Sequence, residues 1–587
     1  MKKFTLLFLF FSLAVWGQNQ KITGIVTDEN NEPVPGANVI IVETGQGTTT
    51  NFDGVFSLAA EKFPATIKIS YIGYKPIVIE VKNSGEIQVQ LKENNEFLDD
   101  VVVTASRGKE KIKESPVSIE RLSLKEIKRN TAPSFYDGLA NLKGVDLNTN
   151  SLTFQSVNTR GFATFANNRF LQLVDGMDNS SPALNFPLGN LIGMNELDVQ
   201  SVEILPGAAS ALYGANAFNG VLNMRSKNPF TYKGLSAYIK YGQTKQEAAG
   251  TNPYTDVGVR YAWGGNYAAA KVNFSFLKGT DWYAVDYTDI DNDPLYNPNK
   301  GNRDTNPAYD GMNVYGDEIV TVLPINDLTG GMLNDIRVSR TGYKEVDLTD
   351  YKAKSMKADI GFYYRPSGQP GKLEFIWNSR FGTGKTIYQG ANRYVLDGIF
   401  IHQHKLEIKN KNFYLRAYYT GEDAGDSYDT RFTAWNINRK WRGDREWFTD
   451  YGRIYVNAKL NGADDATAHK MARDFADNSP VDSFGQPKTP RFKPDTPEYQ
   501  QAFEEVTNDP DFKTGGKFID KSNLKHAEAG YNFKNLVKFA EIQVGASTRR
   551  YSLHSTLMNY ANGKLKKKTF LGCARKNDLN ILIPELK

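Results

Sequence analysis

The stretch that decides the fold of this chain reads Val202-Glu203-Ile204-Leu205-Pro206-Gly207-Ala208-Ala209-Ser210-Ala211-Leu212-Tyr213-Gly214-Ala215-Asn216-Ala217-Phe218-Asn219-Gly220-Val221-Leu222-Asn223-Met224-Arg225-Ser226-Lys227. A strand is expected to end at Leu205, and a glycine turn follows it. A short helix is expected from Ser210 to Gly214, and a second strand starts at Gly220. Glycine permits backbone angles that other residues adopt only with strain. The stretch therefore predicts part of a small α+β domain.

Two shorter motifs precede this stretch in a fixed order. They are Asn158-Thr159-Arg160-Gly161-Phe162 and Leu171-Gln172-Leu173-Val174-Asp175-Gly176. Together the three resemble the plug domain of TonB-dependent outer-membrane receptors. The resemblance assigns motif residues at Arg160, Gly161, Asp175, Gly176, Pro206, Gly207, Tyr213, Gly214 and Gly220. Many relatives carry Arg-Gly-Pro where this chain has Leu205-Pro206-Gly207, so no gating arginine is assigned there.

We predict that this plug domain runs over residues 115–227. Ser123 and Glu126 have the spacing of a capping box, which predicts a short helix that begins after Ser123. The motif glycines Gly161, Gly176, Gly207, Gly214 and Gly220 are expected to form tight turns with positive φ. No Walker or dinucleotide-binding pattern is present.

The N-terminus predicts export. Lys2 and Lys3 precede an apolar run that ends at Gly17, so residues 1–17 are interpreted as a signal peptide. The run is too short for a transmembrane helix. Cys573 is the one cysteine in the sequence, so an intrachain disulfide is excluded. The net charge of +5 is small and dispersed, which does not favour nucleic-acid binding.

Residues 18–92 are predicted to form a separate β-sandwich. Short β-branched runs alternate there with Gly, Pro and Asn. The segments Gly24-Ile25-Val26-Thr27-Asp28, Pro35-Gly36-Ala37-Asn38-Val39, Thr50-Asn51-Phe52-Asp53-Gly54-Val55-Phe56 and Tyr71-Ile72-Gly73-Tyr74 resemble the carboxypeptidase-regulatory-like domain of many Bacteroidetes receptors. The segment contains no histidine, so a zinc peptidase is not predicted.

Residues 93–114 are interpreted as a linker that carries a TonB box. The residues Leu98, Asp99, Asp100, Val101, Val102, Val103 and Thr104 resemble such a box and are flanked by polar sequence. The three valines favour extended backbone, which can add as a strand to the sheet of a periplasmic partner. An ordinary linker strand is the alternative.

Residues 228–550 are predicted to form a partial antiparallel β-barrel. Apolar and polar residues alternate regularly, for example along 270–276, 356–364, 413–419 and 540–547. Short joins near 264–266, 366–371, 410–411 and 534–535 alternate with long ones at about 280–352 and 421–523, which is typical of membrane barrels. A soluble sandwich would alternate in the same way. We expect about nine strands, against roughly 22 in plugged transporters.

The tail at residues 551–587 departs from this pattern. Lys564, Lys566, Lys567 and Lys568 interrupt the alternation, and no aromatic terminal strand follows. We therefore expect a truncated or frame-shifted product whose transport activity is impaired.

Three other groups were weighed as candidate ligand sites. Asp289, Asp291 and Asp293 have odd-position spacing, but Pro294 and Lys300 break the calcium-loop pattern, so a solvated loop is favoured. His402 and His404 share one strand face, and a plain strand face is favoured over a metal site. The aromatic set Trp435, Trp441, Trp447, Phe448 and Tyr451 is interpreted as loop packing or an interface belt in preference to ligand stacking. No metal and no cofactor is predicted.

The predicted fold is therefore mainly β, with a sandwich, a plug and a partial transmembrane barrel. The resemblance implies a receptor that binds a scarce solute outside the cell and imports it when TonB, with its inner-membrane energising complex, displaces the plug. The implied location is the outer membrane, with its lipid around the barrel and with the N-terminal domain and box in the periplasm. No enzyme is predicted. A surface adhesin or binding protein, or a TonB-linked signal transducer, is the alternative. Oligosaccharide, peptide, siderophore and cobalamin all remain candidate solutes, and a surface lipoprotein is a further candidate partner.

Overall fold

The structure is a computed structural model that describes residues 20–71, 74–92, 101–102, 110–111, 117–130, 132–161, 167–214, 216–291, 301–390, 392–537, 542–555 and 572–574. The predicted signal peptide lies outside the described residues. The chain divides into two compact units, one of residues 1–103 with 109–115 and one of residues 104–108 with 116–587.

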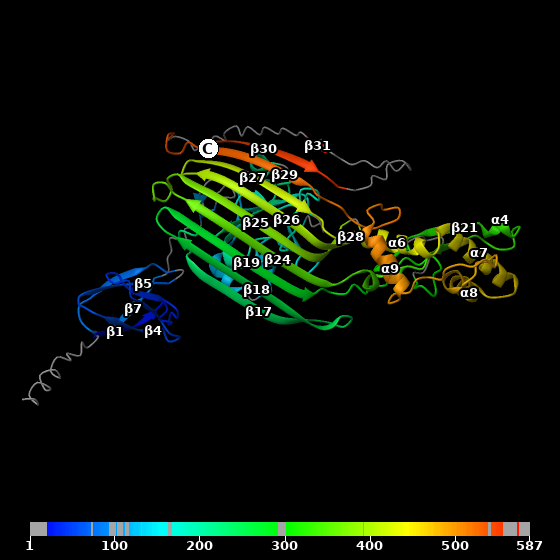
Figure 1. Ribbon diagram of the computed structural model, residues 1–587, viewed down its shortest axis with the longest axis horizontal. Helices are drawn as coiled ribbons and strands as arrows, with labels where there is room; N and C mark the ends of the chain where they lie inside the picture. The colour runs from blue at the N-terminus through cyan, green and yellow to red at the C-terminus, as the bar shows by residue number, and fades with distance from the viewer. Residues whose placement is uncertain are drawn as a thin grey trace, which may run out of the picture. The chain divides into compact units, whose positions relative to one another are not determined.

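The N-terminal unit is a β-sandwich, as predicted (blue in Figure 1). One sheet has the order β4-β1-β7, with β1 at Gln20–Thr27, β4 at Val55–Ala60 and β7 at Gly85–Gln90. The other has the order β3-β2-β5-β6, with β2 at Asn38–Ile41, β3 at Gly47–Thr49, β5 at Ala65–Ser70 and β6 at Ile77–Val81. Alternate side chains such as Ile22, Val39, Phe56 and Ile67 form one core between the sheets.

The plug is built on a five-stranded sheet of order β10-β15-β16-β13-β14. The strands are β10 Glu120–Ser123, β13 Phe170–Val174, β14 Met177–Asp178, β15 Val199–Pro206 and β16 Gly220–Ser226. A hairpin of β11 Val145–Thr149 and β12 Gln155–Thr159 accompanies it. The short helices are α2 Leu124–Arg129, η4 Asp137–Asn141, η5 Glu196–Asp198 and α3 Ser210–Tyr213. The predicted capping box is present, because Ser123 and Glu126 each accept a hydrogen bond from the other's backbone N–H.

The barrel sheet contains nine antiparallel strands of ten or more residues within the described part of the chain, which confirms the predicted number (Figure 1). They are β17 Gly234–Gln246, β18 Gly250–Gly264, β19 Ala268–Thr280, β24 Lys352–Tyr364, β25 Glu374–Gln389, β26 Arg393–Lys409, β27 Phe413–Asp423, β29 Asn523–Asn532 and β30 Gln543–Leu553. The short β31 Gly572–Ala574 pairs with β30, and β28 Tyr428–Asp429 pairs with β26. The sheet is open in this structure. The chain is mainly β, as predicted.

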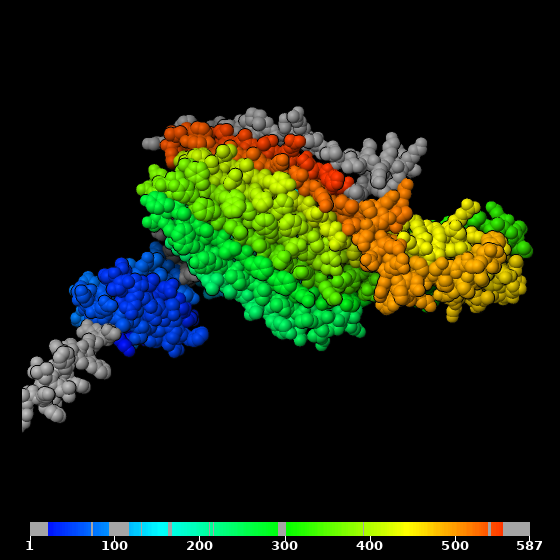
Figure 2. Space-filling view, viewed as in Figure 1, coloured from blue at the N-terminus to red at the C-terminus, as the bar shows by residue number. Residues whose placement is uncertain are grey.

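The two faces of the barrel sheet differ in polarity. We call the face that contacts the plug the inward face and the opposite one the outward face. Large apolar side chains exposed on the outward face of β18 to β26 are Val259, Tyr261, Trp263, Val272, Phe274, Met356, Ile360, Phe362, Tyr364, Phe375, Trp377, Phe400 and Leu406. Buried polar residues on the inward face include Asp256, Arg260, Lys271, Asn273, Ser275, Asp359, Gln403, Lys405, Glu407 and Glu528. Figure 2 views the outward face, which hides the plug.

The two long connections were predicted as loops, but they fold into one lobe of residues 281–351 and 424–522. The first contributes β20 Val314–Tyr315, β21 Val320–Leu323, α4 Ile325–Leu328, β22 Ile336–Ser339, β23 Tyr343–Lys344 and α5 Glu345–Leu348. The second contributes α6 Thr430–Trp441, α7 Asp444–Leu460, α8 Asp465–Asn478 and α9 Pro497–Asn508. Buried Val338 and Tyr343 of the first connection join the apolar clusters of these helices.

Among the described residues, no helix is both long and apolar enough to cross a membrane.

Candidate functional site

The plug contacts the inward face of the barrel sheet through charged and polar groups and through an apolar cluster, in which Phe154, Phe186, Leu188 and Leu191 pack on Tyr388, Leu396, Ile399 and Ile401. The central contact is Asp198 at the end of η5, which is fully buried. Its carboxylate accepts hydrogen bonds from Arg260 Nε at 2.8 Å and Lys271 Nζ at 2.6 Å, and both cations are almost completely buried. Lys271 Nζ also donates to Ser226 Oγ at 2.6 Å. One plug carboxylate thus binds two neighbouring strands, β18 and β19, to the end of the plug sheet.

The turn at Asp175 and Gly176 makes the second contact. Asp175 accepts hydrogen bonds from the Ser226 backbone N–H at 2.9 Å and from Arg380 Nη2 on β25 at 2.6 Å, and its carbonyl accepts one from Lys405 at 3.2 Å. Burial raises the pKa of Asp175, but the charges of Arg380, Lys405 and Lys271 outweigh it and hold that pKa well below its usual range. Asp175 therefore remains an anion at the plug surface.

The guanidinium of Arg416 on β27 lies directly over Gly176. It also pairs with Glu407 at 3.1 Å and with Glu528 at 2.6 Å, so it is the centre of a network on the inward face. Glu407 pairs in turn with Lys405 at 2.9 Å. Because Gly176 has no side chain, the plug backbone can approach this network closely.

A third contact surrounds Asp178 and the segment that follows it. The Asp178 carboxylate lies 3.6 Å from Arg549 Nη1, and its carbonyl accepts a hydrogen bond from Gln403 Nε2 at 2.7 Å. Further along, Glu422 accepts a hydrogen bond from the Ser181 hydroxyl and one from the Ala183 backbone N–H at 2.7 Å. These bonds hold the segment after β14 against β26, β27 and β30.

The first motif lies beside the third within the plug. Arg160 and Gly161 form a left-handed turn, with φ of 60° and 73°. The Arg160 guanidinium covers Gly207, where an added Cβ would lie 2.5 Å from Arg160 Nη1. Thr159 and Asn219 exchange hydrogen bonds that join the same two segments. The structure therefore brings Arg160, Gly161 and Gly207 together, whereas Asp175 and Gly176 lie at the barrel sheet.

The remaining motif residues have packing and turn roles. Pro206 ends β15, Tyr213 is buried in α3, and Gly214 ends that helix with φ of 78°. The predicted positive φ is correct at Gly161, Gly176, Gly207 and Gly214 but wrong at Gly220. Gly220 begins β16, and an added Cβ there would lie 2.7 Å from the Phe170 ring. Close packing against an aromatic ring, and not a turn, explains this glycine.

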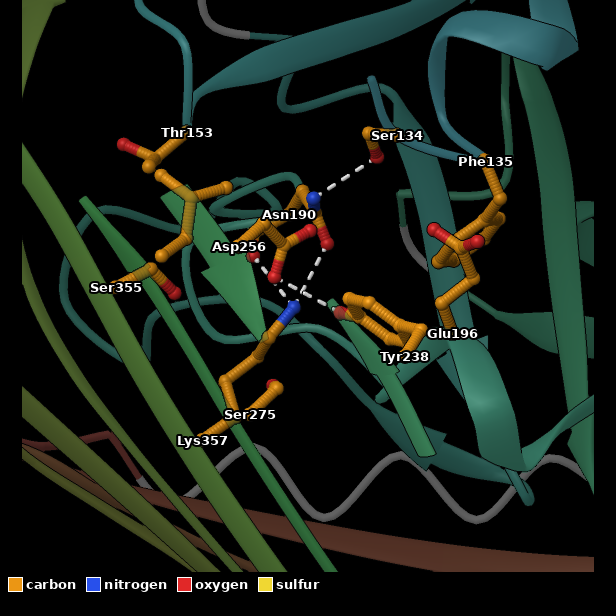
Figure 3. A pocket seen from close by; sticks show the side chains of 11 residues that line it. Ser134, Phe135, Thr153, Asn190, Glu196, Tyr238, Asp256, Ser275, Ser355 and Lys357 are labelled. Atoms are coloured by element: carbon orange, nitrogen blue, oxygen red, sulfur yellow. Dashed lines mark hydrogen bonds between the residues drawn. The ribbon is translucent and has the colours of Figure 1, made fainter. Parts of the chain in front are cut away.

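A small polar cavity lies between the plug and strands β17, β18, β19 and β24 (Figure 3). Its volume is about 20 Å³, which admits a water molecule but no larger solute. Lys357 Nζ points toward the plug and donates to Asn190 Oδ1 at 2.9 Å, while Tyr238 donates to Asp256 at 2.9 Å. A larger passage at this position requires that the plug moves.

The predicted TonB box lies mostly outside the described residues. Val101–Val102 forms the short strand β8, which pairs antiparallel with β9 at Glu110–Lys111. The positions Leu98, Asp99, Asp100, Val103 and Thr104 are not described.

The groups weighed as metal ligands have protein partners. Asp289 accepts hydrogen bonds from Asn306 and from the Asp291 backbone N–H, and Asp291 pairs with Arg337. Both carboxylates are buried, so the favoured interpretation as a solvated loop is wrong for these two residues. Asp293 lies outside the described residues. His402 and His404 hydrogen-bond to each other at 3.0 Å on the outward face. Among the described residues, no cluster of three or more His, Cys, Asp or Glu could hold a metal.

The aromatic residues of the lobe form its core. Trp447 and Tyr451 are fully buried, and Trp441 and Phe448 nearly so, which supports the interpretation as packing. Trp447 Nε1 donates to Asp477 at 2.9 Å. Trp435 is half-buried and donates to Glu318 of the first connection at 2.9 Å.

A half-buried histidine beside the lobe core, His469, predicts a pH-dependent contribution to stability. Burial, reinforced by the charge of Arg473, lowers the pKa of His469 to about 4. Between pH 6.5 and 4 the unfolded chain binds a proton at this position that the folded lobe does not, so we expect the contribution of His469 to the stability of the lobe to fall as the pH falls through this window. Burial raises the pKa of Asp310 and of Asp429 to about 6, which acts in the opposite sense, so the contribution of His469 is taken as the difference between the parent chain and a variant at this position. The slope for one proton is at most about 1.4 kcal/mol per pH unit. Urea unfolding of the full chain, followed by tryptophan fluorescence, measures it.

In the variant His469→Gln this dependence is expected to be lost, because glutamine can accept the hydrogen bond of Tyr451 but does not titrate. His554, an exposed residue that follows β30 and lies outside the lobe, provides the substitution control: His554→Gln should leave the stability of the lobe unchanged. An equal slope in His469→Gln and in the parent chain contradicts the assignment.

Sequence reasoning missed most of the residues that hold the plug. Arg260, Arg380, Lys405, Glu407 and Glu422 carry no motif, and Asp198 lies between two motifs. The alternation of apolar and polar residues could have identified the barrel residues among them, because each occupies a polar position of its strand. The pairing partner of each could not be inferred, because it depends on how the plug is oriented inside the sheet.

The plug and the barrel sheet that it contacts define the architecture of a plugged β-barrel, and the sandwich precedes them in the chain. Residues 22–103 match the family model described as CarboxypepD_reg-like domain, and residues 111–221 match the TonB-dependent Receptor Plug Domain. The chain thus carries the N-terminal domain and the plug domain of TonB-dependent receptors of the Bacteroidetes form.

Individual proteins are similar to this chain. The chain is 31% identical over 225 residues to the TonB-dependent receptor SusC of Bacteroides thetaiotaomicron, a match that covers 37% of this chain and 22% of that protein. It is 25% identical over 415 residues to the TonB-dependent receptor P3 of Formosa agariphila, which covers 67% of this chain and 39% of that one. The ferric enterobactin receptor of Pseudomonas aeruginosa is a similar solved structure, with 12% identity and a TM-score of 0.41 over 77% of this chain and 51% of that chain. The chain thus spans less than half of the length of SusC and of P3.

Proposed function

We propose that this protein is an outer-membrane receptor that binds a solute at the cell surface and imports it when TonB displaces the plug. The observation that carries the proposal is the polarity of the contact between plug and barrel sheet. Asp175, Asp178 and Asp198 each face cations of the barrel sheet. Groups of this kind regain hydration when they separate, which offsets part of the cost of releasing the plug. Release also breaks the apolar cluster that the plug forms with Tyr388, Leu396, Ile399 and Ile401, so it requires an energy supply.

The lack of room beside the docked plug supports a moving plug. Ligand pockets in proteins usually enclose about 300–1,000 Å³. The cavity beside Lys357 has a volume of about 20 Å³. Passage of any nutrient along this part of the wall therefore requires displacement of the segments that line the cavity, among them those of Ser134 and Asn190.

We assign the coupling between TonB and the plug to residues 98–104. We infer five domains: a signal peptide at 1–17, the sandwich at 18–92, the box and linker at 93–114, the plug at 115–227 and the barrel at 228–550. The sandwich and the box then lie in the periplasm. Added as an edge strand to the sheet of TonB, the box transmits force through main-chain hydrogen bonds. The protein performs no covalent chemistry in this proposal. The solute is unassigned, and a surface lipoprotein is a further candidate partner.

The test is a deletion of residues 98–104 in the gene of the native host. Energised uptake of the solute is expected to be abolished, while surface binding is expected to stay within about twofold of the parent. Val102→Pro, which removes a backbone donor, is expected to act like the deletion. Val102→Thr is the matched control and should retain uptake, because it keeps the donor and the β-branched side chain. Uptake that survives the deletion refutes the assignment.

The same experiment distinguishes the alternatives. For a surface adhesin or binding protein, no energy-dependent uptake is found and ligand attachment is independent of the inner-membrane energy supply. For a signal transducer, the deletion changes transcription without a change in uptake.

A further inference from the structure

Three lysines lie side by side on the outward face of the barrel sheet. In the register of the strands, Lys278 of β19 is directly opposite Lys354 of β24, and Lys354 is directly opposite Lys385 of β25. Directly opposite residues share one face of a sheet, and their Cβ atoms lie about 5 Å apart. We call these three residues the lysine ladder. Ser355, the residue after Lys354, is buried on the inward face. Because successive residues of a strand point to opposite faces, the ladder lies on the outward face.

Like charges at directly opposite positions destabilise a sheet unless an anion lies between them. Lys385 has such anions, because its Nζ lies 2.9 Å from Asp350 and 2.8 Å from Asp397. Among the described residues, Lys278 and Lys354 form no ion pair with a carboxylate. Lys354 Nζ lies 5.9 Å from the centre of the Phe276 ring, which is an aromatic neighbour and supplies no counter-charge. Two adjacent cations are therefore left for an external anion.

The ladder lies at one border of the apolar band. Below it on the same face, successive cross-strand rows are Phe276 with Met356, Phe274 with Ala358, Val272 with Ile360 and Ala270 with Phe362. The band ends at Tyr364 and Phe375, whose aromatic rings pair at the short-turn end of the strands. From Lys354 to Tyr364 the strand advances ten residues, or about 33 Å along its axis. At a tilt of about 40° this is about 25 Å of height, which is the height of the lipid-facing band of outer-membrane barrels.

The ladder is at the end of the strands from which the lobe extends, since Lys278 is two residues before the end of β19 and Lys354 is two residues after the start of β24. On the proposed function, this end faces the outside of the cell. The ladder is then level with the headgroups of the outer leaflet, directly above a surface that contacts acyl chains.

We propose that Lys278 and Lys354 bind a phosphate group of an outer-leaflet glycolipid whose acyl chains pack on Phe276 and Met356 below. This inference rests on the proposed function for the orientation of the barrel. Two ammonium groups on neighbouring strands are close enough to share one phosphate. Lys385 lies next to them, but its charge is already paired with Asp350 and Asp397, so the phosphate site consists of Lys278 and Lys354.

A second pair of cations has the same arrangement further along the sheet. Lys525 of β29 is directly opposite Arg550 of β30, both side chains are exposed, and both lie near the same end of their strands. The outer border of the band thus carries cations at two separate places.

The test uses the full chain purified in detergent and stripped of lipid. Binding of diphosphorylated lipid A is compared with binding of the same lipid after removal of its phosphates and with inorganic phosphate alone, by native mass spectrometry and by titration. The phosphorylated lipid is expected to bind at least tenfold more tightly than the dephosphorylated lipid. The variant K278Q/K354Q is expected to lose this preference, and K278R/K354R is expected to keep it.

The matched control is K245Q. Lys245 is also an exposed lysine near the outer end of a strand, but Thr251 is directly opposite it, so it has no cationic neighbour in the register. Its variant should bind the phosphorylated lipid within about twofold of the parent. Equal binding of the two lipids by the parent chain overturns the proposal, and this comparison requires no variant to fold. Binding of inorganic phosphate as tightly as the lipid also overturns it, because the source is then not a lipid.

Failure of the lipid site and failure of the transport proposal are distinguishable. Lipid binding is measured on purified protein without TonB, so the box deletion should leave it unchanged. Conversely, K278Q/K354Q leaves the box and the plug contacts intact.

Discussion

Replacement of Asp198 by asparagine is expected to weaken the attachment of the plug to the barrel sheet by about 3–5 kcal/mol. Asp198 is the shared partner of Arg260 and Lys271, and all three side chains are almost completely buried. Asparagine preserves the size of the side chain but leaves two buried cations without their anion. The change is measured as the free energy of opening of the β16 amides by hydrogen exchange, because β16 ends at Ser226, which also contacts Lys271.

Glu196 provides a matched control two residues away in the same short helix. It pairs with Lys240 of β17 at 2.8 Å, but the two side chains are 24% and 29% exposed. A partly hydrated ion pair contributes at most about 1 kcal/mol, so Glu196→Gln should change the opening free energy by no more than that. Equal effects of the two variants would show that burial of Asp198 is not what anchors the plug.

The contrast between these two carboxylates shows how far the sequence predicts the site. The order of domains, the plug motifs, the capping box and the nine strands follow from local patterns, because alternation and glycine turns are properties of short segments. The sequence also indicates that Lys271 and Arg416 lie on the polar face of their strands. The sequence does not indicate that the partners of Asp198 are buried whereas the partner of Glu196 is partly exposed. The exposure of these partners depends on packing between residues that are more than 40 positions apart in the chain.

The lobe was beyond prediction for a similar reason. Its helices have polar surfaces, and its aromatic residues pack against a connection more than 100 residues earlier in the chain, as Trp441 and Trp447 do with Arg340. The sequence pattern predicts loops where a segment has no barrel alternation. Whether such a loop folds on another loop is decided by long-range contacts that no short window contains.

The glycine motifs provide a sharper case, since Gly161 and Gly176 look equivalent in the sequence. Both have positive φ, of 73° and 78°. An added Cβ at Gly161 would meet no atom of the described residues within 4 Å, whereas at Gly176 it would overlap the guanidinium of Arg416. Gly161 is therefore required for the backbone turn alone, and Gly176 is required for both the turn and the contact with the barrel sheet.

Gly176→Ala is accordingly expected to weaken the attachment of the plug to the barrel sheet more than Gly161→Ala does. The left-handed backbone costs about 1–2 kcal/mol. Displacement of Arg416 also weakens its pairs with Glu407 and Glu528, and loss of a buried charge partner costs about 3–5 kcal/mol. We expect a total above about 4 kcal/mol in the opening free energy of the plug amides, measured by hydrogen exchange.

Gly161→Ala, the matched control, should cost only the backbone contribution of about 1–2 kcal/mol. A double-mutant cycle isolates the contact, because in the background Arg416→Ala the guanidinium is absent and Gly176→Ala should also fall to the backbone contribution. If Gly176→Ala is as costly in that background as in the parent chain, Arg416 is not the neighbour that requires glycine. A coupling of several kcal/mol instead identifies position 176 as the point where the plug backbone docks on the charge network of the barrel sheet.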